Sequence, residues 1–430
     1  MPSFGATIKK YVLGALRPMP RLRRVVRRVI WRLRRARYEQ LARRIEREPR
    51  TILFESYGGR SYACSPKALF EALCEDRRFD GWHFIWSFRE PREKEALAEA
   101  LLLKTRATLV RRASREYLQA CARATYWITN NRMPEFLHPQ SGQIYVQCWH
   151  GTPLKRLGFD VATDAQAALN TAAELAERFA LDAEKWTWLL SPSSYTSERL
   201  TSAFGRIADR QSLVIEEGYP RNDAIVTTLR SPAALERIEA IKRRLDIPLD
   251  KRVVLYAPTW RDDSFQAGVG YTQDVLLDFE LLRRELGMDW VVLLRAHYYI
   301  ANRLDTERWR GFVYDVSGVE DVNDLYVISD ALLTDYSSVC FDFANTARPL
   351  LFFWPDLDHY GDKVRGFYFD PKTLPGPKCR TSTEVAFALK DIDNWHARYT
   401  SAYEEFRQKF SPQDDGNATP RVITKLFDNL

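Results

Sequence analysis

The sequence contains little cysteine, and its cysteines are scattered. Six of the 430 residues are cysteine, no two of them form a C-x-x-C pair, and none has a histidine at the spacing of metal ligands. This usage is expected of a reducing compartment and argues against a disulfide framework and against a zinc site. We therefore expect a cytosolic protein with no metal and no bound cofactor.

The sequence also lacks long apolar runs and the common nucleotide-binding glycine motifs. The uncharged run Tyr11–Leu16, before the first basic cluster, is far shorter than the roughly 20 residues that a membrane-spanning helix needs, and no signal-peptide cleavage site follows it. Neither G-x-x-x-x-G-K-[ST] nor G-x-G-x-x-G occurs. A P-loop NTPase and a dinucleotide oxidoreductase are therefore disfavoured.

The charge of the chain is unevenly distributed. The formal net charge is +7, but residues 1–50 hold sixteen Lys and Arg against three Glu, so the remaining 380 residues are mildly acidic. With 45% hydrophobic residues the chain can bury a large core, and its 430 residues are enough for two domains behind a basic arm. We place the arm at residues 1–50, a first domain at 51–220 and a second domain at 221–430.

The arm is predicted to be a basic amphipathic helix. Apolar residues recur at helical spacing from Leu22 to Ile45, and arginines fill most of the remaining circumference. Such a helix could dock on the protein's own body, lie on anionic lipid or bind nucleic acid. Few aromatic platforms and an acidic body argue against nucleic acid. We favour an anionic membrane surface, where each Arg contributes about 1 kcal/mol.

Short apolar runs of strand length alternate with helical segments along both predicted domains. Examples are 51–57, 83–88, 125–129 and 143–149 in the first domain, and 252–256, 290–294, 331–334 and 350–354 in the second. This alternation predicts an α/β fold with parallel sheets covered on both faces. Ligands of such sheets collect at the carboxyl ends of the strands.

One strand end in the second domain is suited to phosphate. Ala331–Thr334 reads as a buried strand, Asp335–Ser338 as a polar turn and Val339 onward as a helix. The hydroxyl groups of Ser337 and Ser338, beside the positive end of a helix, could hold a phosphate, although Asp335 or Ser337 could simply cap the helix. Asp342 could accept hydrogen bonds from a ribose or only favour the helix dipole.

Two other strand ends carry candidate residues. His150 follows the strand at 143–149 and precedes Gly151, which suits a general base at the mouth of a cleft, with Lys155 and Arg156 near an anionic acceptor. A histidine that only bonds a loop carbonyl is the alternative. Arg295 and His297 follow the strand at 290–294 and form a pyrophosphate site if that strand neighbours the one at 331–334. A buried Arg paired with a structural carboxylate is the alternative there.

Six motifs in order resemble those of the CDP-glycerol glycerophosphotransferases, the teichoic acid primases and polymerases. They are His150-Gly151-Thr152 with Lys155, Gly218–Asp223, Ala257–Arg261, Arg295-x-His297, Asp335–Ser338 with Phe341-Asp342, and Arg365–Tyr368. The resemblance spans roughly residues 54–370. One departure is Tyr298, where members of the family commonly have proline.

The resemblance implies a GT-B fold, with two Rossmann-like domains facing a cleft and the donor nucleotide held by the second. It implies that His150 is the catalytic base and that His297, Ser337, Ser338 and Arg365 contact the phosphates of CDP-glycerol or a related CDP-polyol. It also implies a peripheral enzyme on the inner face of the cell membrane that acts on a lipid-linked saccharide or polymer acceptor.

Other functions remain open at this point. A GT-B glycosyltransferase that uses a nucleotide sugar is the alternative enzyme, and a membrane-bound scaffold without chemistry is the alternative from another class. The sequence does not distinguish a primase from a polymerase, or glycerol from ribitol in the donor. Whether the polymer is a wall teichoic acid or a capsule, and the oligomeric state, are open as well.

Overall fold

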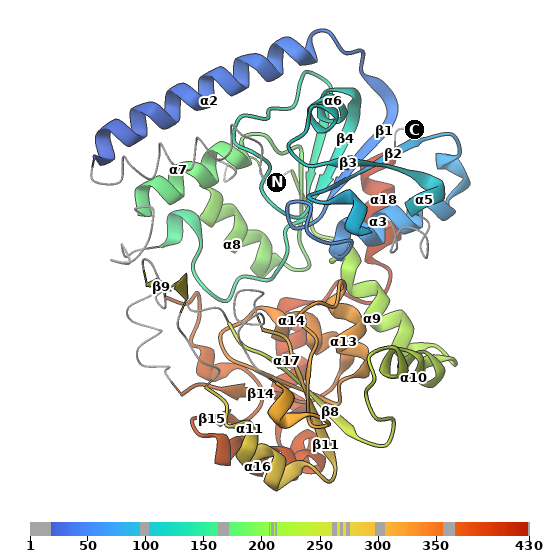
Figure 1. Cartoon of the computed structure of the whole chain (residues 1–430), viewed down its shortest axis with the longest axis vertical. Helices are drawn as coiled ribbons and strands as arrows, with labels where there is room; N and C mark the ends of the chain where they lie inside the picture. Colours follow the sequence, from blue (N-terminus) through green and yellow to red (C-terminus); the bar gives the residue numbers. More distant parts are fainter. Residues whose placement is uncertain are drawn as a thin grey trace.

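The computed structural model describes residues 19–94, 103–161, 172–205, 207, 210, 213–259, 265–266, 270–271, 276–296, 306–355 and 366–428. These residues form two lobes, each built on a parallel sheet (Figure 1). A small antiparallel pair, β9 (Phe265–Gln266) and β10 (Gly270–Tyr271), stands apart from both sheets.

The first sheet has seven parallel strands in the order β3-β2-β1-β4-β5-β6-β7. Its strands are β1 (Glu48–Glu55), β2 (His83–Phe88), β3 (Ala107–Arg111), β4 (Ala124–Thr129), β5 (Ile144–Gln147), β6 (Trp188–Leu190) and β7 (Val214–Ile215). The helices of this part are α3 (Cys64–Glu75), α5 (Leu103–Arg106), α6 (Arg115–Arg123), α7 (Ala172–Ala183) and α8 (Ser194–Phe204).

The second sheet has six parallel strands in the order β12-β11-β8-β13-β14-β15. Its strands are β8 (Arg252–Ala257), β11 (Trp290–Leu294), β12 (Val313–Asp315), β13 (Ala331–Thr334), β14 (Leu350–Phe353) and β15 (Lys378–Cys379). The accompanying helices are α9 (Pro220–Arg230), α10 (Ala234–Arg244), α11 (Phe279–Leu286), α13 (Val322–Ile328), α14 (Val339–Phe343), α16 (Ser382–Lys390) and α17 (Trp395–Phe410).

In both sheets the sequence order of the strands changes direction beside the strand that comes first in the chain, although all the strands stay parallel. This is the doubly wound Rossmann arrangement. In this arrangement ligands bind outside the carboxyl ends of the strands, where the order reverses. The reversal lies between β1 and β4 in the first sheet and between β8 and β13 in the second. The predicted α/β class with two Rossmann-like domains is therefore confirmed.

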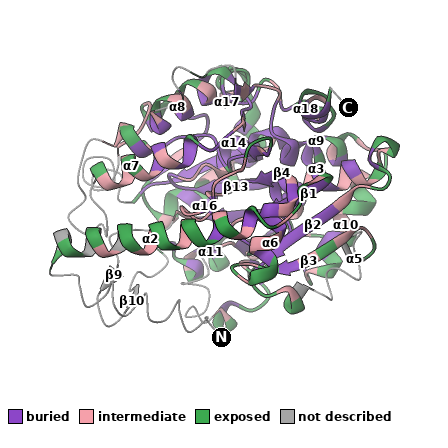
Figure 2. Ribbon diagram, turned by 90° about the horizontal axis from the view of Figure 1, so that it is seen from above, coloured by how far each residue is buried: buried purple, intermediate pink, exposed green. Residues whose placement is uncertain are grey.

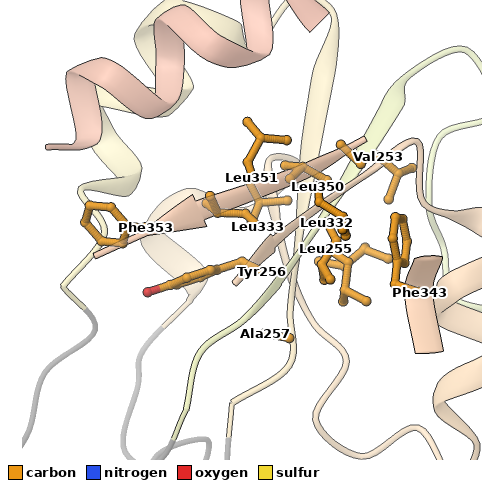
Figure 3. Close-up of a cluster of buried hydrophobic side chains, with 14 of the residues drawn as sticks. Val253, Leu255, Tyr256, Ala257, Leu332, Leu333, Phe343, Leu350, Leu351 and Phe353 are labelled. Atoms are coloured by element: carbon orange, nitrogen blue, oxygen red, sulfur yellow. The ribbon is translucent and has the colours of Figure 1, made fainter. Parts of the chain in front are cut away.

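The strands read as unbroken apolar runs because both faces of each sheet are covered. In the second sheet, Leu255 of β8, Leu332 of β13 and Leu350 of β14 pair across the strands, and they lie on the side of the sheet that faces Phe343 of α14 (Figure 3). Each fully buried side chain of this size stabilises the fold by roughly 1.5–3 kcal/mol. This packing fixes the strand ends that carry the site.

The two faces of the first sheet have separate cores. Leu53 of β1 belongs to a cluster with residues of α2 (Pro20–Ala42), α6, α7 and α8, whereas its neighbours Ile52 and Phe54 belong to a cluster with α3 and α18 (Ala418–Phe427). Figure 1 shows α18, at the end of the chain, in the upper lobe. We predicted that the second domain spans residues 221–430, but this last helix packs on the first sheet.

Helix α2 has one docked end and one exposed stripe. Near its carboxyl end Tyr38 is buried in the core of the first domain. Toward its amino end Leu22, Val25, Val29 and Leu33 are 46–57% exposed, and Figure 2 shows exposed residues along the helix. Docking on the protein's own body, one of the alternatives for this helix, therefore holds at its carboxyl end, and the residues nearer its amino end face outward.

The joint between the domains begins a helix. We predicted Gly218–Asp223 as a run of turn formers, but α9 starts at Pro220. Proline is favoured at the first helical position because its missing N–H needs no partner there, and Asp223 favours the first turn through the helix dipole. The same residues thus end one domain and open the first helix of the next.

Candidate active site

A cavity of about 710 Å³ lies between the two domains at the carboxyl ends of their strands. The described residues that line it come mainly from the loops after β1, β5, β8, β11, β12 and β13, with others from α9, α13 and α14, and they include His150, Ser337 and Ser338. The two points where the sheets reverse order therefore face the same space. This volume falls within the range of small-molecule and nucleotide sites.

His150 is held in a fixed orientation at one wall of the cavity. Its Nδ1 lies 2.7 Å from the backbone oxygen of Asn130, which follows β4. A carbonyl oxygen only accepts, so Nδ1 carries the proton and Nε2 keeps a lone pair. The preceding residue, Trp149, has a φ of +52°, which turns the chain sharply after β5, and its ring packs 4.6 Å from the imidazole. The carbonyl-bonding and general-base interpretations are thus compatible.

The surroundings of His150 keep the imidazole neutral. Desolvation of the ring in the cleft lowers its pKa to about 4, even though part of the ring is open to the cavity. The hydrogen bond to Asn130 acts in the opposite direction and raises the pKa. The guanidinium groups of Arg221, Arg132 and Arg60 lower the pKa further. A neutral imidazole at neutral pH can take a proton from a hydroxyl group.

The turn after β13 is clamped to the end of β8. Asp335 Oδ1 accepts from the backbone N–H groups of Thr259, at 2.8 Å, and Tyr336, at 2.6 Å. Tyr336 is buried, whereas Ser337 and Ser338 are only partly buried and line the cavity. Helix α14 spans five residues, so the two hydroxyl groups contribute more to an anion site than its dipole does.

The loops of the two domains meet at Gly151. A Cβ atom at this position would lie only 2.7 Å from Ser338 Oγ and 3.2 Å from Ser338 Cβ. Glycine therefore permits a close approach that any other residue would oppose. The catalytic candidate His150 and the serine turn are brought together here from opposite domains.

Arg295 takes a different position from the one expected. We expected it beside the Asp335–Ser338 turn if β11 and β13 were neighbours, but β8 lies between these strands. Its Nη1 donates to the carbonyl oxygens of Val316, at 3.2 Å, and Val319, at 3.0 Å. Arg295 thus braces the loop after β12 while still lining the cavity, and its partners in the described chain are carbonyl groups, not the carboxylate of the alternative interpretation.

Asp342 is engaged in a buried ion pair. Arg221 Nη2 donates to Asp342 Oδ1 at 2.8 Å and Nε donates to Oδ2 at 3.2 Å, while Asn222 Nδ2 donates to Oδ1 at 3.1 Å. Both carboxylate oxygens therefore have partners, and a ribose contact of Asp342 stays a prediction. From the sequence we placed Arg221 in a motif but did not predict that it lines the cavity. The only sign of this role in the sequence was a charged residue at the start of a helix.

Lys155 and Arg156 differ in their exposure to the cavity. Lys155 lines the cavity and pairs as an antiparallel bridge with Phe367. Arg156 lies outside the described lining, and its Nε donates to the backbone oxygen of Phe367 at 3.2 Å. The loop after β5 is thus joined to the R-G-F-Y segment across the domains.

His297 and Arg365, the two remaining predicted phosphate contacts, lie outside the described residues. Tyr298 lies outside them as well. Among the residues that are described, no cluster of three or more His, Cys, Asp or Glu has the arrangement of a metal site. These predicted contacts stay predictions.

Two Rossmann-like domains that face a shared cavity, with a neutral histidine opposite a serine turn, define a protein of the GT-B class. The model of the CDP-glycerol:poly(glycerophosphate) glycerophosphotransferase family matches residues 38–428. The chain belongs to this family.

Curated relatives carry teichoic acid names. The chain is 40% identical over 392 residues to the teichoic acid poly(glycerol phosphate) polymerase of Bacillus subtilis (strain 168), covering 90% of this chain and 50% of that protein. It is 40% identical over 377 residues to the teichoic acid glycerol-phosphate transferase of Staphylococcus aureus (strain NCTC 8325 / PS 47), covering 87% of this chain and 92% of that one. The chain thus spans about half the length of some relatives and most of others.

Solved structures of the wall teichoic acid polymerase TagF share the fold. One of them, a histidine variant soaked with CDPG, has a TM-score of 0.82 and 35% identity, covering 94% of this chain and 96% of that one. The predicted GT-B fold and the predicted family are therefore confirmed.

Proposed function

We propose that the protein transfers glycerol phosphate from CDP-glycerol to a hydroxyl group of a lipid-linked acceptor and releases CMP, in the synthesis of a teichoic acid. The family, the names of its relatives and the cavity support this function. One observation carries it: His150, with a free Nε2 lone pair, directly precedes Gly151, which packs against Ser338 in the serine turn of the opposite domain. The nucleotide-sugar alternative has no comparable support.

In the proposed reaction His150 Nε2 takes the proton of the acceptor hydroxyl. The hydroxyl oxygen attacks the phosphorus that bears the glycerol, a new P–O bond forms, and the bond from this phosphorus to the CMP oxygen breaks. Negative charge develops on the departing phosphate, so positioning and electrostatic stabilisation supply most of the rate. Ser337 and Ser338 would donate to the phosphate oxygens, together with His297 and Arg365.

The direct test is a donor comparison with a His150 variant. Wild-type protein incubated with a lipid-linked acceptor should release CMP from CDP-glycerol and no UDP from UDP-sugars. His150→Ala should lose about 10² to 10⁴ in turnover, the typical contribution of one general base, while its Kd for CDP-glycerol changes less than threefold. His83→Ala, at a histidine outside the cavity, is the matched control. Wild-type turnover in the His150 variant would refute the assignment.

The place of action is proposed to be the cytoplasmic face of the cell membrane, reached through α2. No helix in the described part of the chain is long and apolar enough to cross a membrane. The exposed stripe of α2, formed by Leu22, Val25, Val29 and Leu33, supports an interfacial position, since its apolar side chains would enter the lipid while arginines contact anionic head groups. A lipid-linked acceptor would then be within reach of the cavity.

A further inference from the structure

The loop after β1 is tightly constrained and carries a cation into the cavity. Tyr57, Gly58 and Gly59 have φ values of +49°, +65° and +74°. A Cβ atom at Gly59 would lie 3.0 Å from the backbone nitrogen of Arg89, which donates to the Gly59 oxygen at 2.7 Å. Arg60 follows directly, so its backbone is held in one place.

The same loop contacts the catalytic histidine. The Tyr57 N–H donates to Asn130 Oδ1 at 2.7 Å, and the backbone oxygen of the same Asn130 holds His150. The rings of Tyr57 and His150 meet edge to face at 6.1 Å. Arg60 therefore lies on the loop that packs beside the imidazole.

Arg60 is exposed at the cavity and has no fixed partner there. It lines the cavity together with His150, and its guanidinium forms no hydrogen bond or ion pair with the residues that the structure describes. Its charge is near enough to lower the pKa of His150. An exposed cation on a rigid loop is available to a ligand.

The charged groups of the cavity are divided between the domains. Of the described lining residues, the acidic ones all come from the second domain: Glu320, Asp321 and Asp342. Asp321 pairs with Lys67 at 2.7 Å, and Glu320 accepts from the Tyr62 N–H at 3.0 Å.

The charged residues that the first domain contributes to the described lining are all positive. They are Arg60, on the loop after β1, and Lys155, on the loop that carries His150. Because an acid would repel an anion and none is present on this wall, the wall favours a negatively charged group close to the imidazole.

We propose that Arg60 binds a phosphate of the acceptor. This inference rests on the proposed function and specifies its acceptor class: a chain that already ends in a glycerol phosphate unit. In such an acceptor the attacking hydroxyl and the nearest phosphate are separated by one three-carbon glycerol, so the phosphate reaches the first-domain wall while the hydroxyl meets His150. A neutral saccharide acceptor has no group for Arg60, and the protein therefore prefers to elongate a started chain.

The experiment compares two soluble acceptors, a short glycerol phosphate oligomer and a neutral alkyl disaccharide. With the oligomer, Arg60→Ala should raise the acceptor KM about tenfold, the value of one lost charge-assisted hydrogen bond, and leave the CDP-glycerol KM unchanged. Arg60→Lys should restore part of the loss. Arg115→Ala removes an exposed arginine of the same domain outside the cavity and should behave as wild type.

Three results would overturn the proposal: an unchanged acceptor KM in Arg60→Ala, an equal rise for the neutral acceptor, or a rise in the KM of CDP-glycerol, which would assign Arg60 to the donor. If wild-type protein transfers nothing from CDP-glycerol, the proposed function fails by itself. Arg60 is then judged by calorimetric binding of the oligomer alone: about tenfold weaker binding in Arg60→Ala supports it, and equal binding overturns it.

Discussion

The imidazole of His150 depends on backbone as much as on its own chemistry. The carbonyl of Asn130 selects the tautomer, and the positive φ of Trp149 turns the side chain from the end of β5. Both groups come from strands that are paired in the sheet, β4 and β5. The site is therefore assembled from neighbouring strand ends. A local sequence motif describes each of these strand ends only in part.

The lowered pKa of His150 predicts an unusual acid limit of activity. The base works only when neutral, so kcat/KM falls as the pH falls through the pKa of the free enzyme. Because desolvation in the cleft and nearby arginines lower this pKa to about 4, the fall should lie well below pH 6.5. Arg132→Gln removes one of these cations and should move the fall to higher pH. Profiles of kcat/KM from pH 3 to 8 check this, with circular dichroism to verify folding; a wild-type fall at or above pH 6.5 contradicts it.

At the scale of the element, the two loops that meet at Gly151 act as one unit. The loop after β5 and the turn after β13 belong to different sheets, and their approach leaves no room for a Cβ. The turn after β13 is also held to the end of β8 by the hydrogen bond between Asp335 and Thr259. A small displacement of either loop changes the distance between His150 and Ser338.

Substitution at Gly151 should therefore be costly and coupled to Ser338. Gly151→Ala introduces a clash of the kind that costs about 1–3 kcal/mol, which would lower kcat/KM about tenfold or more. In the Ser338→Ala background the hydroxyl is gone, so the added loss should be smaller. A double-mutant cycle on kcat/KM measures the coupling, expected at about 1 kcal/mol. Additive effects would show that the loops do not interact in this way.

Elements with strong apolar runs were predictable, and their arrangement was not. The bounds predicted for β2, β11 and β13 match those of the structure, because a buried strand flanked by turn residues is a clear local signal. β12, of three residues, and α11 were missed. The order of strands, which placed β8 between β11 and β13, and the Arg221–Asp342 pair, 121 residues apart in sequence, are tertiary facts without a local signal.

At the scale of the whole molecule, the lobes are joined at two places beside the cavity. Lys67 of α3 pairs with Asp321, and the segments around Lys155 and Phe367 form a bridge. Helix α2 lies across the first lobe and carries exposed residues along its length (Figures 1 and 2), and its apolar stripe is among them. The surface that would contact lipid is thus separate from the joint between the domains.

This separation predicts that membrane binding can be removed without loss of chemistry. Replacing Leu22, Val25, Val29 and Leu33 together with Gln should reduce binding to anionic vesicles more than tenfold, because the stripe loses its apolar surface. Turnover of a soluble acceptor should stay within twofold of wild type. Sedimentation with vesicles measures the first effect and CMP release the second.

The matched control replaces four exposed apolar residues elsewhere with Gln. They are Leu235, Leu249, Met288 and Phe387. This variant should bind vesicles as wild type does. Equal vesicle binding by the α2 variant and the wild type would contradict an interfacial role of the stripe.

The position of α18 affects how the chain can fold during its synthesis. The face of the first sheet that carries Ile52 and Phe54 is completed by Val422 and Leu426, which leave the ribosome more than 350 residues later. Until then the amino-terminal half has an apolar face that α3 covers only in part, and domains that emerge first normally fold first. Final consolidation of the lobe that carries His150 must therefore wait for translation of the second lobe, so the two walls of the cavity become native together.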